Sequence, residues 1–472
     1  MESQFSTQSS SPIGDIPYDV LREVFTYCVP QHPRDRFIDQ PSFNNAPVIL
    51  SHVCSSWMLV AHTSPILWCY LSCQIVLIDD DIDNKQWRLR KRDVELIRWW
   101  REKHGKFHPF IVMDAVFRHT ADEDQIADED ASTFFLGYLA SAQYLDIGST
   151  FWDELNDLHF VCPNLHTLVL NGKEEYDLDP PFSSSQSIFS LAAASPLRRL
   201  SLNNGTLYYH GDAVSQKAWS SLTHIAMQDV MISLNFWFDL IWAAPTLEWA
   251  YADINDMEFD CEVSVKCVLP HLTSLFIICH DDNMSAAFSG LSLPALHTLS
   301  LSSTGQHVNA IWMTEHAIEE LHQILKAAPN ITTLALGRNF LGLGDPIFTS
   351  TPVANLPLEG TEPLWKNTPH LASLHLEKPF HYSATAQDAE KYFQEFTEHI
   401  FIPNAGWLSP GNSECPISTI TLVNSDIKKV GNNTLSRCRE LGERRGNIRI
   451  QFSGTSLDEQ AWKSVKEWGL MI

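Results

Sequence analysis

The sequence predicts an α/β protein in two parts. These are an N-terminal motif of three short helices and, after it, a long, irregular solenoid of parallel strands alternating with helices. Three observations favour this fold class. The chain has 472 residues, too many for one compact core. Apolar residues recur at helical spacing within the first seventy positions. Short segments of alternating leucines, most of them opened by proline, then recur along the rest of the chain.

The composition of the chain limits the classes of binding partner and the cellular compartments that are expected. The chain carries 32 Lys and Arg against 57 Asp and Glu, a formal charge of −25. Because an acidic surface repels phosphate, neither nucleic acid nor a membrane surface is expected to bind. Residues 1–11 are rich in Ser, Gln and Thr and lack the basic start and apolar core of a signal peptide, so a disordered tail is predicted. The ten cysteines form no CxxC pair, which favours reduced, buried thiols in a cytoplasmic or nuclear protein.

Residues 12–70 are predicted to form the helical motif. In its first helix Pro17 lies in the first turn, where a missing N–H costs nothing, and Asp15 is the expected N-cap. The apolar stripe of this helix comprises Val20, Leu21, Val24, Phe25 and Cys28. The second helix carries Leu50, Val53, Cys54, Trp57 and Ala61 at spacings of three and four. Ser64 and Pro65 open a short third helix that contains Leu67 and Trp68.

Three helices of this length cannot bury all their apolar faces against one another. An apolar stripe is left over, and it needs a partner. Two alternatives remain open at this point. The stripe packs on the neighbouring domain of the same chain, or it binds another protein.

The order and spacing of these residues resemble the F-box, in particular the fungal F-box-like proteins with an inserted loop between the first two helices. The matching positions are Ile16, Pro17, Leu21, Glu23, Val24, Phe25, Leu50, Val53, Cys54, Trp57, Ala61, Pro65, Leu67 and Trp68. The resemblance implies docking on the Skp-type adaptor of a cullin–RING ubiquitin ligase. The adaptor-binding residues that it implies are Ile16, Pro17, Leu21, Val24, Phe25, Leu50, Val53, Cys54, Trp57, Leu67 and Trp68.

Residues 71–150 are expected to form a capping unit between the two parts. It contains a predicted strand at 71–77, a Trp-rich helix at 85–104 closed by Gly105, and a second strand at 109–117. The acidic stretch 122–130 is interpreted as a solvated loop.

Residues 151–472 carry a repeated P-x-L-x-x-L-x-L pattern. Its prolines are Pro163, Pro196, Pro245, Pro270, Pro294, Pro329 and Pro369, and weaker copies span 142–147, 219–227 and 415–422. The alternation suits a short strand with its leucines turned inward. Helical periodicity appears between copies at 232–244, 315–328 and 385–399. The alternative, an ordinary α/β domain with coincidental leucine strings, is disfavoured by the number of copies.

The repeats resemble leucine-rich repeats, and the spacing of Pro245, Pro270 and Pro294 falls near the period of that family, about 20–29 residues. Asn339 and Asn255 stand where the resemblance implies an asparagine ladder. Nearly the whole chain is therefore similar to F-box proteins with leucine-rich repeats, although its repeats diverge from the pattern of that family.

No catalytic residue, metal site or cofactor is expected. Walker A, HExxH, GxSxG and paired CxxC motifs are absent from the sequence. The twenty histidines are spread singly, which favours surface or hydrogen-bonded core histidines over metal ligands. The Gly342 and Gly344 pair lacks the third glycine of a dinucleotide loop and is interpreted as a repeat turn.

Two sets of residues are candidates for binding a target. In LxxLxL the third and fifth positions face away from the leucine core, which places the aromatics Trp249, Tyr251 and Phe276 together on the opposite face. They are either interface residues or packed under another segment. The basic residues Lys428, Lys429, Arg437, Arg439, Arg444, Arg445 and Arg449 are either a solvated helix and a charged edge strand, or a patch for an acidic partner.

The function expected from the sequence is that of a non-catalytic substrate adaptor in a Skp–cullin–F-box ubiquitin ligase. The F-box-like motif would bind the adaptor and cullin complex, and the repeats would bind an unknown target protein. A repeat scaffold no longer coupled to ubiquitination is the alternative. An enzyme with a site in the repeat insertions is a third hypothesis, which the absence of catalytic motifs disfavours.

Overall fold

The structure is a computed structural model. It describes residues 16–29, 46–79, 87–118, 129–148, 161–171, 195–206, 219–232, 234–254, 267–279, 287–288, 290–303, 315–337, 367–377, 416–423, 432–446, 448–466 and 468. The chain divides into two compact units. Unit 1 comprises Met1–Lys173, Ser190–Leu197 and Lys466–Ile472, and unit 2 comprises Glu174–Phe189 and Arg198–Val465. The domain boundaries predicted at residues 70 and 150 stay predictions.

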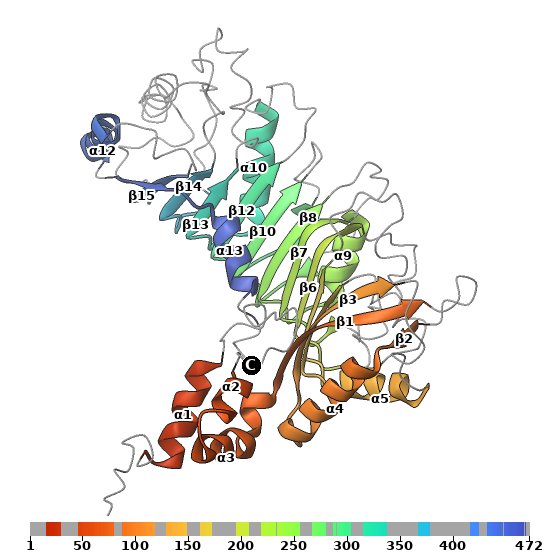
Figure 1. Cartoon of the computed structure of the whole chain (residues 1–472). Helices are drawn as coiled ribbons and strands as arrows, with labels where there is room; N and C mark the ends of the chain where they lie inside the picture. Colours follow the sequence, from red (N-terminus) through yellow and green to blue (C-terminus); the bar gives the residue numbers. More distant parts are fainter. Residues whose placement is uncertain are drawn as a thin grey trace, which may run out of the picture. The chain divides into compact units, whose positions relative to one another are not determined.

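One long sheet contains most of the described strands, in the order β16-β15-β14-β13-β12-β10-β8-β7-β6-β5-β4-β3-β1-β2 (Figure 1). In unit 1 its strands are β1 (Tyr70–Asp79), β2 (Trp87–Leu89), β3 (Phe110–Arg118), β4 (Tyr144–Gly148) and β5 (Thr167–Asn171). In unit 2 they are β6 (Arg199–Thr206), β7 (His224–Met231), β8 (Trp249–Ile254), β10 (Ser274–Cys279), β12 (Thr298–Ser303), β13 (Thr333–Leu336), β14 (Ser373–Glu377), β15 (Thr419–Val423) and β16 (Arg449–Ser453). A second, two-stranded sheet pairs β9 (Cys267–Val268) with β11 (Leu291–Ser292).

Thirteen of these strands run parallel in chain order, which is consistent with a repeat α/β fold. The register places like positions side by side: Leu275 pairs with Leu299, and Leu299 with Leu334. All three leucines are buried, so the repeated leucines form layers, as the alternation predicts. The parallel pairing of β10 with β12 confirms the parallel strands predicted from the repeated pattern.

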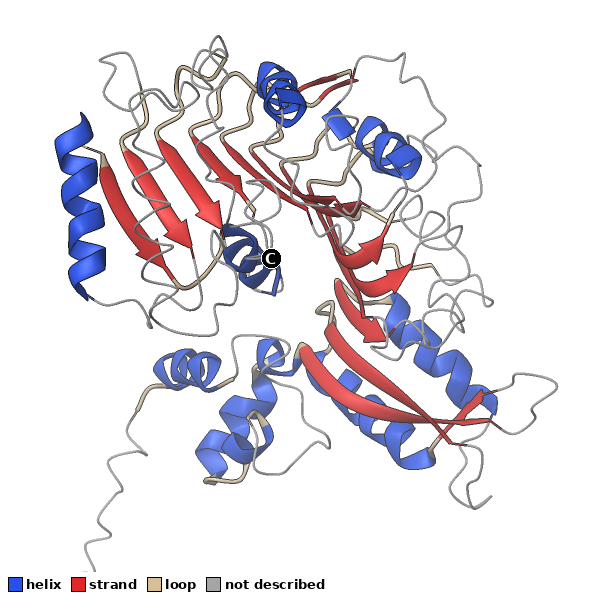
Figure 2. Ribbon diagram, turned by 90° about the horizontal axis from the view of Figure 1, so that it is seen from above, coloured by secondary structure: helices blue, strands red, loops and turns tan. Residues whose placement is uncertain are grey.

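Two of the helices predicted between strands are present. The predicted helices at 232–244 and 315–328 are confirmed as α9 (Leu234–Ala243) and α10 (Glu315–Ala327). In α10 the buried residues Leu321, Ile324 and Leu325 recur at three and four, while Gln323 and Lys326 are exposed. In unit 2, α9 and α10 lie on one face of the sheet, and α13 (Leu457–Lys466) lies on the other (Figure 2). We call the α13 side the inner face.

Some predicted features lie outside the described residues. They are the tail 1–11, most of the acidic stretch 122–130, the helix 385–399, the positions of Asn255 and Asn339, and the Gly342 and Gly344 turn.

The N-terminal helices differ from the predicted three-helix motif. The first is present as α1 (Tyr18–Cys28). Its N-cap residue is Pro17 and not the predicted Asp15, so Pro17 precedes the first turn and does not lie in it. The second is broken into α2 (Val48–Ser51) and α3 (Ser55–Thr63), because Cys54 takes an extended conformation between them. The Ser51 hydroxyl also donates to the Val48 carbonyl, 2.6 Å away, a side-chain bond that competes with helix continuation. The third helix is a single 3-10 turn, η3 (Pro65–Trp68). The predicted compact motif is therefore replaced by four short helical segments.

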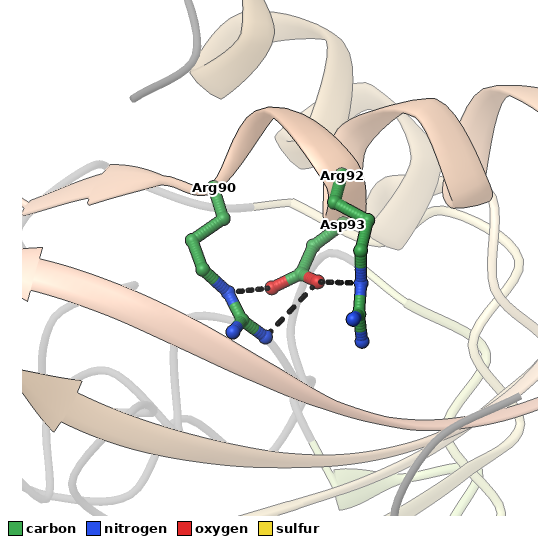
Figure 3. A network of polar contacts seen from close by, with 3 residues as sticks. All are labelled: Arg90, Arg92 and Asp93. Atoms are coloured by element: carbon green, nitrogen blue, oxygen red, sulfur yellow. Dashed lines mark hydrogen bonds and ion pairs between the residues drawn. The ribbon is translucent and has the colours of Figure 1, made fainter. Parts of the chain in front are cut away.

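The Trp-rich helix begins later than predicted. Residues 87–89 form β2 and pair antiparallel with Leu77–Asp79, so α4 covers only Lys91–His104. Asp93, in its first turn, accepts two hydrogen bonds from the Arg90 guanidinium, at 3.0 and 3.2 Å, and lies 3.9 Å from Arg92 Nε (Figure 3). A carboxylate there also complements the positive end of the helix dipole. Gly105, at a φ of 64°, ends the helix as predicted.

A cluster of indole rings joins the N-terminal helices to α4 within unit 1. Trp68 is fully buried, with its ring centroid 4.9 Å from that of Trp99 and 5.1 Å from that of Trp100, edge to face in both cases. Its Nε1 donates to the Ala61 carbonyl at 2.8 Å. Part of the predicted apolar stripe is thus covered by this unit itself.

Candidate protein-interaction surfaces

About half of the residues predicted to bind the adaptor lie in the core of unit 1. Those that are buried are Leu21, Phe25, Leu50, Leu67 and Trp68. Phe25 packs edge to face against Trp57, with 5.0 Å between the ring centroids, and this contact joins α1 to α3. Trp57 is partly buried. These side chains hold the helices together, and little of their surface is accessible to a partner protein.

The other predicted residues are exposed, namely Ile16, Pro17, Val24, Val53 and Cys54. The structure adds exposed apolar side chains that the motif comparison did not single out: Tyr18, Val20, Tyr27, Ile49, Met58, Leu59 and Ile66. Helical spacing identifies some of these, because Val20, Val24 and Tyr27 stand at i, i+4 and i+7. The outward turn of Met58 and Leu59 depends on where α3 begins, which the sequence pattern did not show.

Exposed apolar side chains are concentrated in this segment. Among the described residues fifteen large apolar side chains are exposed, and ten of them lie between Ile16 and Ile66. The other five are scattered, at Trp99, Phe107, Val161, Trp242 and Val268. Scattered apolar residues are ordinary on a protein surface, whereas large contiguous apolar patches are typical of interaction sites.

On α1 the buried and exposed apolar residues lie side by side. Leu21 and Phe25 form the buried line, and Val20, Val24 and Tyr27 form the line next to it. Only one half of the apolar arc of α1 is therefore covered within unit 1. We call the exposed line Val20, Val24 and Tyr27 the α1 stripe.

The three predicted target-binding aromatics lie together on the inner face of unit 2. Phe276 of β10 pairs in register with Tyr251 of β8, and Trp249 stands two residues before Tyr251. Ring centroids are 5.5 Å apart for Trp249 and Phe276, and 6.3 Å apart for Tyr251 and Phe276. We call these three residues the aromatic cluster.

The aromatic cluster is largely covered. Tyr251 is 4% and Phe276 5% exposed, while Trp249 is partly exposed. Trp462 of α13 lies against Tyr251, with 6.0 Å between the ring centroids. Of the two alternatives left open by the sequence, the structure shows packing under another segment for Tyr251. The sequence pattern could not show that a helix more than two hundred residues away returns to this face.

His224 of β7 extends the row of rings. It stacks on Trp249 with 6.4 Å between centroids, and its Nδ1 lies 2.9 Å from the Thr223 hydroxyl. Burial, reinforced by the positive charge of Arg199, lowers the pKa of His224 to about 4, so this ring is neutral at pH 7. Burial and neighbouring Arg198 also lower the pKa of Arg199, whereas Glu248 acts in the opposite direction.

The predicted basic residues are placed only in part. Lys428 and Lys429 lie outside the described residues, as do the side chains of Arg444 and Arg445 in α12 (Asn432–Gly446). Arg437 and Arg439 are exposed on α12, and the Arg439 guanidinium lies 5.1 Å from the Phe452 ring centroid. Arg449 is exposed on β16, the last strand in the sheet order, as predicted for a charged edge strand.

The cysteines correct one expectation. Cys69, Cys162, Cys267 and Cys279 are buried free thiols, but Cys28 and Cys54 are exposed. Both lie at helix ends, which explains why the apolar setting of their sequence did not bury them. Burial raises the pKa of Cys69 to about 12 and also raises that of Cys162, so neither is a thiolate at pH 7.

The described ranges hold no group of three His, Cys, Asp or Glu side chains placed to bind a metal ion. No helix within those ranges is long and apolar enough to cross a membrane. No protein-family model matches the chain, and no curated protein matches its sequence.

Proposed function

We propose that this protein recruits substrates to a ubiquitin ligase of the Skp–cullin–F-box type. Its N-terminal helices bind a Skp-type adaptor, and its strand–helix array, a divergent leucine-rich-repeat solenoid, binds the target. The observation that carries the proposal is the concentration of exposed apolar side chains between Ile16 and Ile66. It falls on the segment whose residues resemble the F-box.

The size of this exposed surface argues for a protein partner. Fully burying one exposed Val, Leu or Ile side chain is worth about 1.5–3 kcal/mol, and a side chain that is about half exposed, such as Val20 or Val24, gains about half of that. A partner that covers the α1 stripe and the exposed residues of α3 therefore gains several such contributions, minus the cost of association. Val20 and Val24 lose little side-chain entropy on binding, because β-branched residues in a helix already have one main rotamer.

The buried and exposed halves of the motif have different roles in this proposal. Leu21, Phe25 and Trp57 set the relative position of α1 and α3. The α1 stripe and Val53 contact the adaptor. The protein itself performs no chemistry, and ubiquitin transfer follows because the bound target is held at a high effective concentration beside the ligase.

The repeat array supplies the target-binding part. Parallel strands with leucines layered on one side form a rigid support, and their alternate residues are free to vary without disturbing that core. Such a surface is preorganised, so a target bound there loses less entropy than one bound by mobile loops.

The test is co-purification of a Skp-type adaptor and cullin with the tagged full chain. Val20→Asp combined with Val24→Asp should reduce adaptor recovery at least about tenfold, because two charges enter an apolar contact. Neither side chain is buried, so the chain should keep its circular dichroism spectrum and melting temperature. The matched control is Val268→Asp, a similarly exposed valine of β9 (54% against 46% for Val24), which should leave adaptor recovery unchanged.

Equal adaptor recovery from the stripe variant and the unaltered chain would contradict the docking surface. Recovery of a target without any adaptor or cullin from the unaltered chain would favour the alternative, a repeat scaffold that is not coupled to ubiquitination.

A further inference from the structure

The chain returns across its own sheet after the last strand. Beyond β16 a tight turn is held by Ser453, whose hydroxyl donates to the Thr455 carbonyl at 2.7 Å. Ser456 then caps α13, its hydroxyl accepting a hydrogen bond from the Glu459 N–H at 3.0 Å. Asp458 and Glu459 stand in the first turn, where acidic side chains complement the helix dipole. These local signals start a helix at a defined point, close to the inner face.

Contacts of α13 reach strands far from β16 in the sheet. The Ser302 hydroxyl of β12 donates to Asp458 Oδ2 at 3.0 Å, and Trp462 packs on Tyr251 of β8. In the sheet order, three strands separate β16 from β12, and five strands separate β16 from β8. Helix α13 also lies on the face opposite α9 and α10 (Figure 2). It therefore does not connect neighbouring strands as a crossover helix does.

The helix presents one face to the sheet. Asp458, Trp462 and Val465 stand at i, i+4 and i+7, so they line one side of α13. Val465 is buried, and Ala461 beside it is buried as well. Glu459, Gln460 and Lys463 are exposed on the other side. The seated face thus consists of an acid, an aromatic ring and small apolar side chains.

We propose that α13 is an internal ligand of a helix-binding surface formed by the aromatic cluster and Ser302. A target binds by inserting an amphipathic helix of the same chemistry, with a carboxylate followed four residues later by an aromatic residue, and displaces α13. The proposal rests on the proposed function for its assumption that the inner face receives targets. The seating of α13 itself does not depend on the N-terminal helices.

Several properties suit α13 to displacement. It spans ten residues, a length at which an isolated helix is marginal in water. Trp462 and Asp458 keep part of their surface exposed, so the seating is incomplete. Its advantage over a target is its covalent attachment, since a short linker typically gives an effective concentration on the order of millimolar. A target helix with a more complete fit overcomes that advantage.

The carboxylate of Asp458 has a physical role in the binding of α13. Ser302 is a neutral donor at the end of β12, and a hydrogen bond to a charged acceptor is about twice as strong as one to a neutral acceptor. An asparagine in place of Asp458 keeps the acceptor but loses the charge. Replacing that acid in a competing helix should therefore weaken its binding.

The experiment uses the full chain and a fluorescein-labelled peptide of residues 455–467, followed by fluorescence polarisation. The peptide should bind the Trp462→Ala chain at least about tenfold more tightly than the unaltered chain, because the internal helix no longer competes. Lys463→Ala, an exposed position on the same helix, is the matched control and should bind as weakly as the unaltered chain. A peptide with Asp458→Asn, or a Trp462→Ala chain that also carries Ser302→Ala, should bind several-fold more weakly.

Equal peptide affinity for the Trp462→Ala, Lys463→Ala and unaltered chains would overturn the proposal. So would loss of cooperative melting in the Trp462→Ala chain, since α13 would then be required for folding. Hydrogen exchange on the unaltered chain gives an independent answer. Amides of α13 should exchange at least about a hundredfold faster than those of β8 and β10. Exchange as slow as in those strands would refute displacement, whereas the adaptor result depends only on the N-terminal helices.

Discussion

At the scale of single residues, buried and partly buried histidines make stability depend on pH. Burial lowers the pKa of His224, with Arg199 adding to the effect, and burial also lowers the pKa of His62, His104 and His375. In the unfolded chain each returns to its ordinary value near 6.5. Between the two values the unfolded chain binds more protons, so acid favours unfolding. The stabilisation is complete above the unfolded value and is lost as the pH falls through the window down to about 4.

His224→Gln should flatten this dependence. Glutamine has no proton to gain, so the variant should lose less stability than the unaltered chain between about pH 7 and about pH 4.5. The measurement is urea unfolding at the two pH values, followed by circular dichroism. The control is His297→Gln, at an exposed position directly before β12. Its stability should change with pH as that of the unaltered chain does. A His224→Gln chain that loses as much stability in acid as the unaltered one would disprove the assignment.

At the scale of elements, the close approach of neighbouring repeats is visible at Gly337, directly after β13. Its N–H donates to the Leu301 carbonyl of β12 at 2.7 Å. A β-carbon at Gly337 would lie 2.9 Å from Ser302 Cα, which is backbone and cannot turn aside. Only glycine therefore fits between these two repeats without a shift of the strand ends.

Gly337→Ala should cost about 1–3 kcal/mol of the free energy of unfolding, because the added methyl group forces β12 and β13 apart. Gly137→Ala is the matched control: it lies on the exposed side of α5 (Glu129–Ala140), with no atom within 4 Å of its added β-carbon. That change should be neutral or stabilise by up to about 1 kcal/mol, since alanine favours helix. Equal melting temperatures for the two variants would count against the close packing.

What the sequence could predict also differs between elements. The strands were accessible because a leucine pattern with a period of two, repeated many times, leaves one register. The breaks were not: the interruption at Cys54 and the pairing of residues 87–89 with β1 depend on tertiary contacts. Apolar pattern alone also could not divide the N-terminal stripe into buried Phe25 and exposed Val24, since both are apolar and adjacent. The packing of Trp462 of α13 on Tyr251 likewise depends on a tertiary contact between segments far apart in the sequence, which a local pattern does not show.

At the scale of the whole molecule, an edge strand of a long sheet is exposed to pairing with other chains. β16 stands at the end of the sheet order, with Arg449 and Gln451 exposed on it and alternating with buried Ile450. Charge on an edge strand discourages a second strand from adding, and the formal charge of −25 keeps whole molecules apart.

Arg449→Val combined with Gln451→Val should promote self-association. The expected result is a concentration-dependent rise in mass by size-exclusion chromatography with light scattering, larger in about 1 M salt than at low salt, because salt screens the repulsion between acidic molecules. Thr273→Val, an exposed position that precedes an interior strand, serves as the control and should stay at the mass of the unaltered chain. A monomeric double variant at high concentration and high salt would show that β16 is protected in another way.

The indole cluster at Trp68, Trp99 and Trp100 has a mechanical consequence. When a docking motif is joined by a flexible linker, the domain attached to it can take many orientations relative to the partner. Here three indole rings pack edge to face, and the Trp68 N–H donates to the Ala61 carbonyl. These contacts form a rigid connection between the N-terminal helices and α4. A ligase that grips those helices would thereby hold α4 and β1 at a set angle. This rigid connection would then help to fix the orientation in which a ligase holds unit 1.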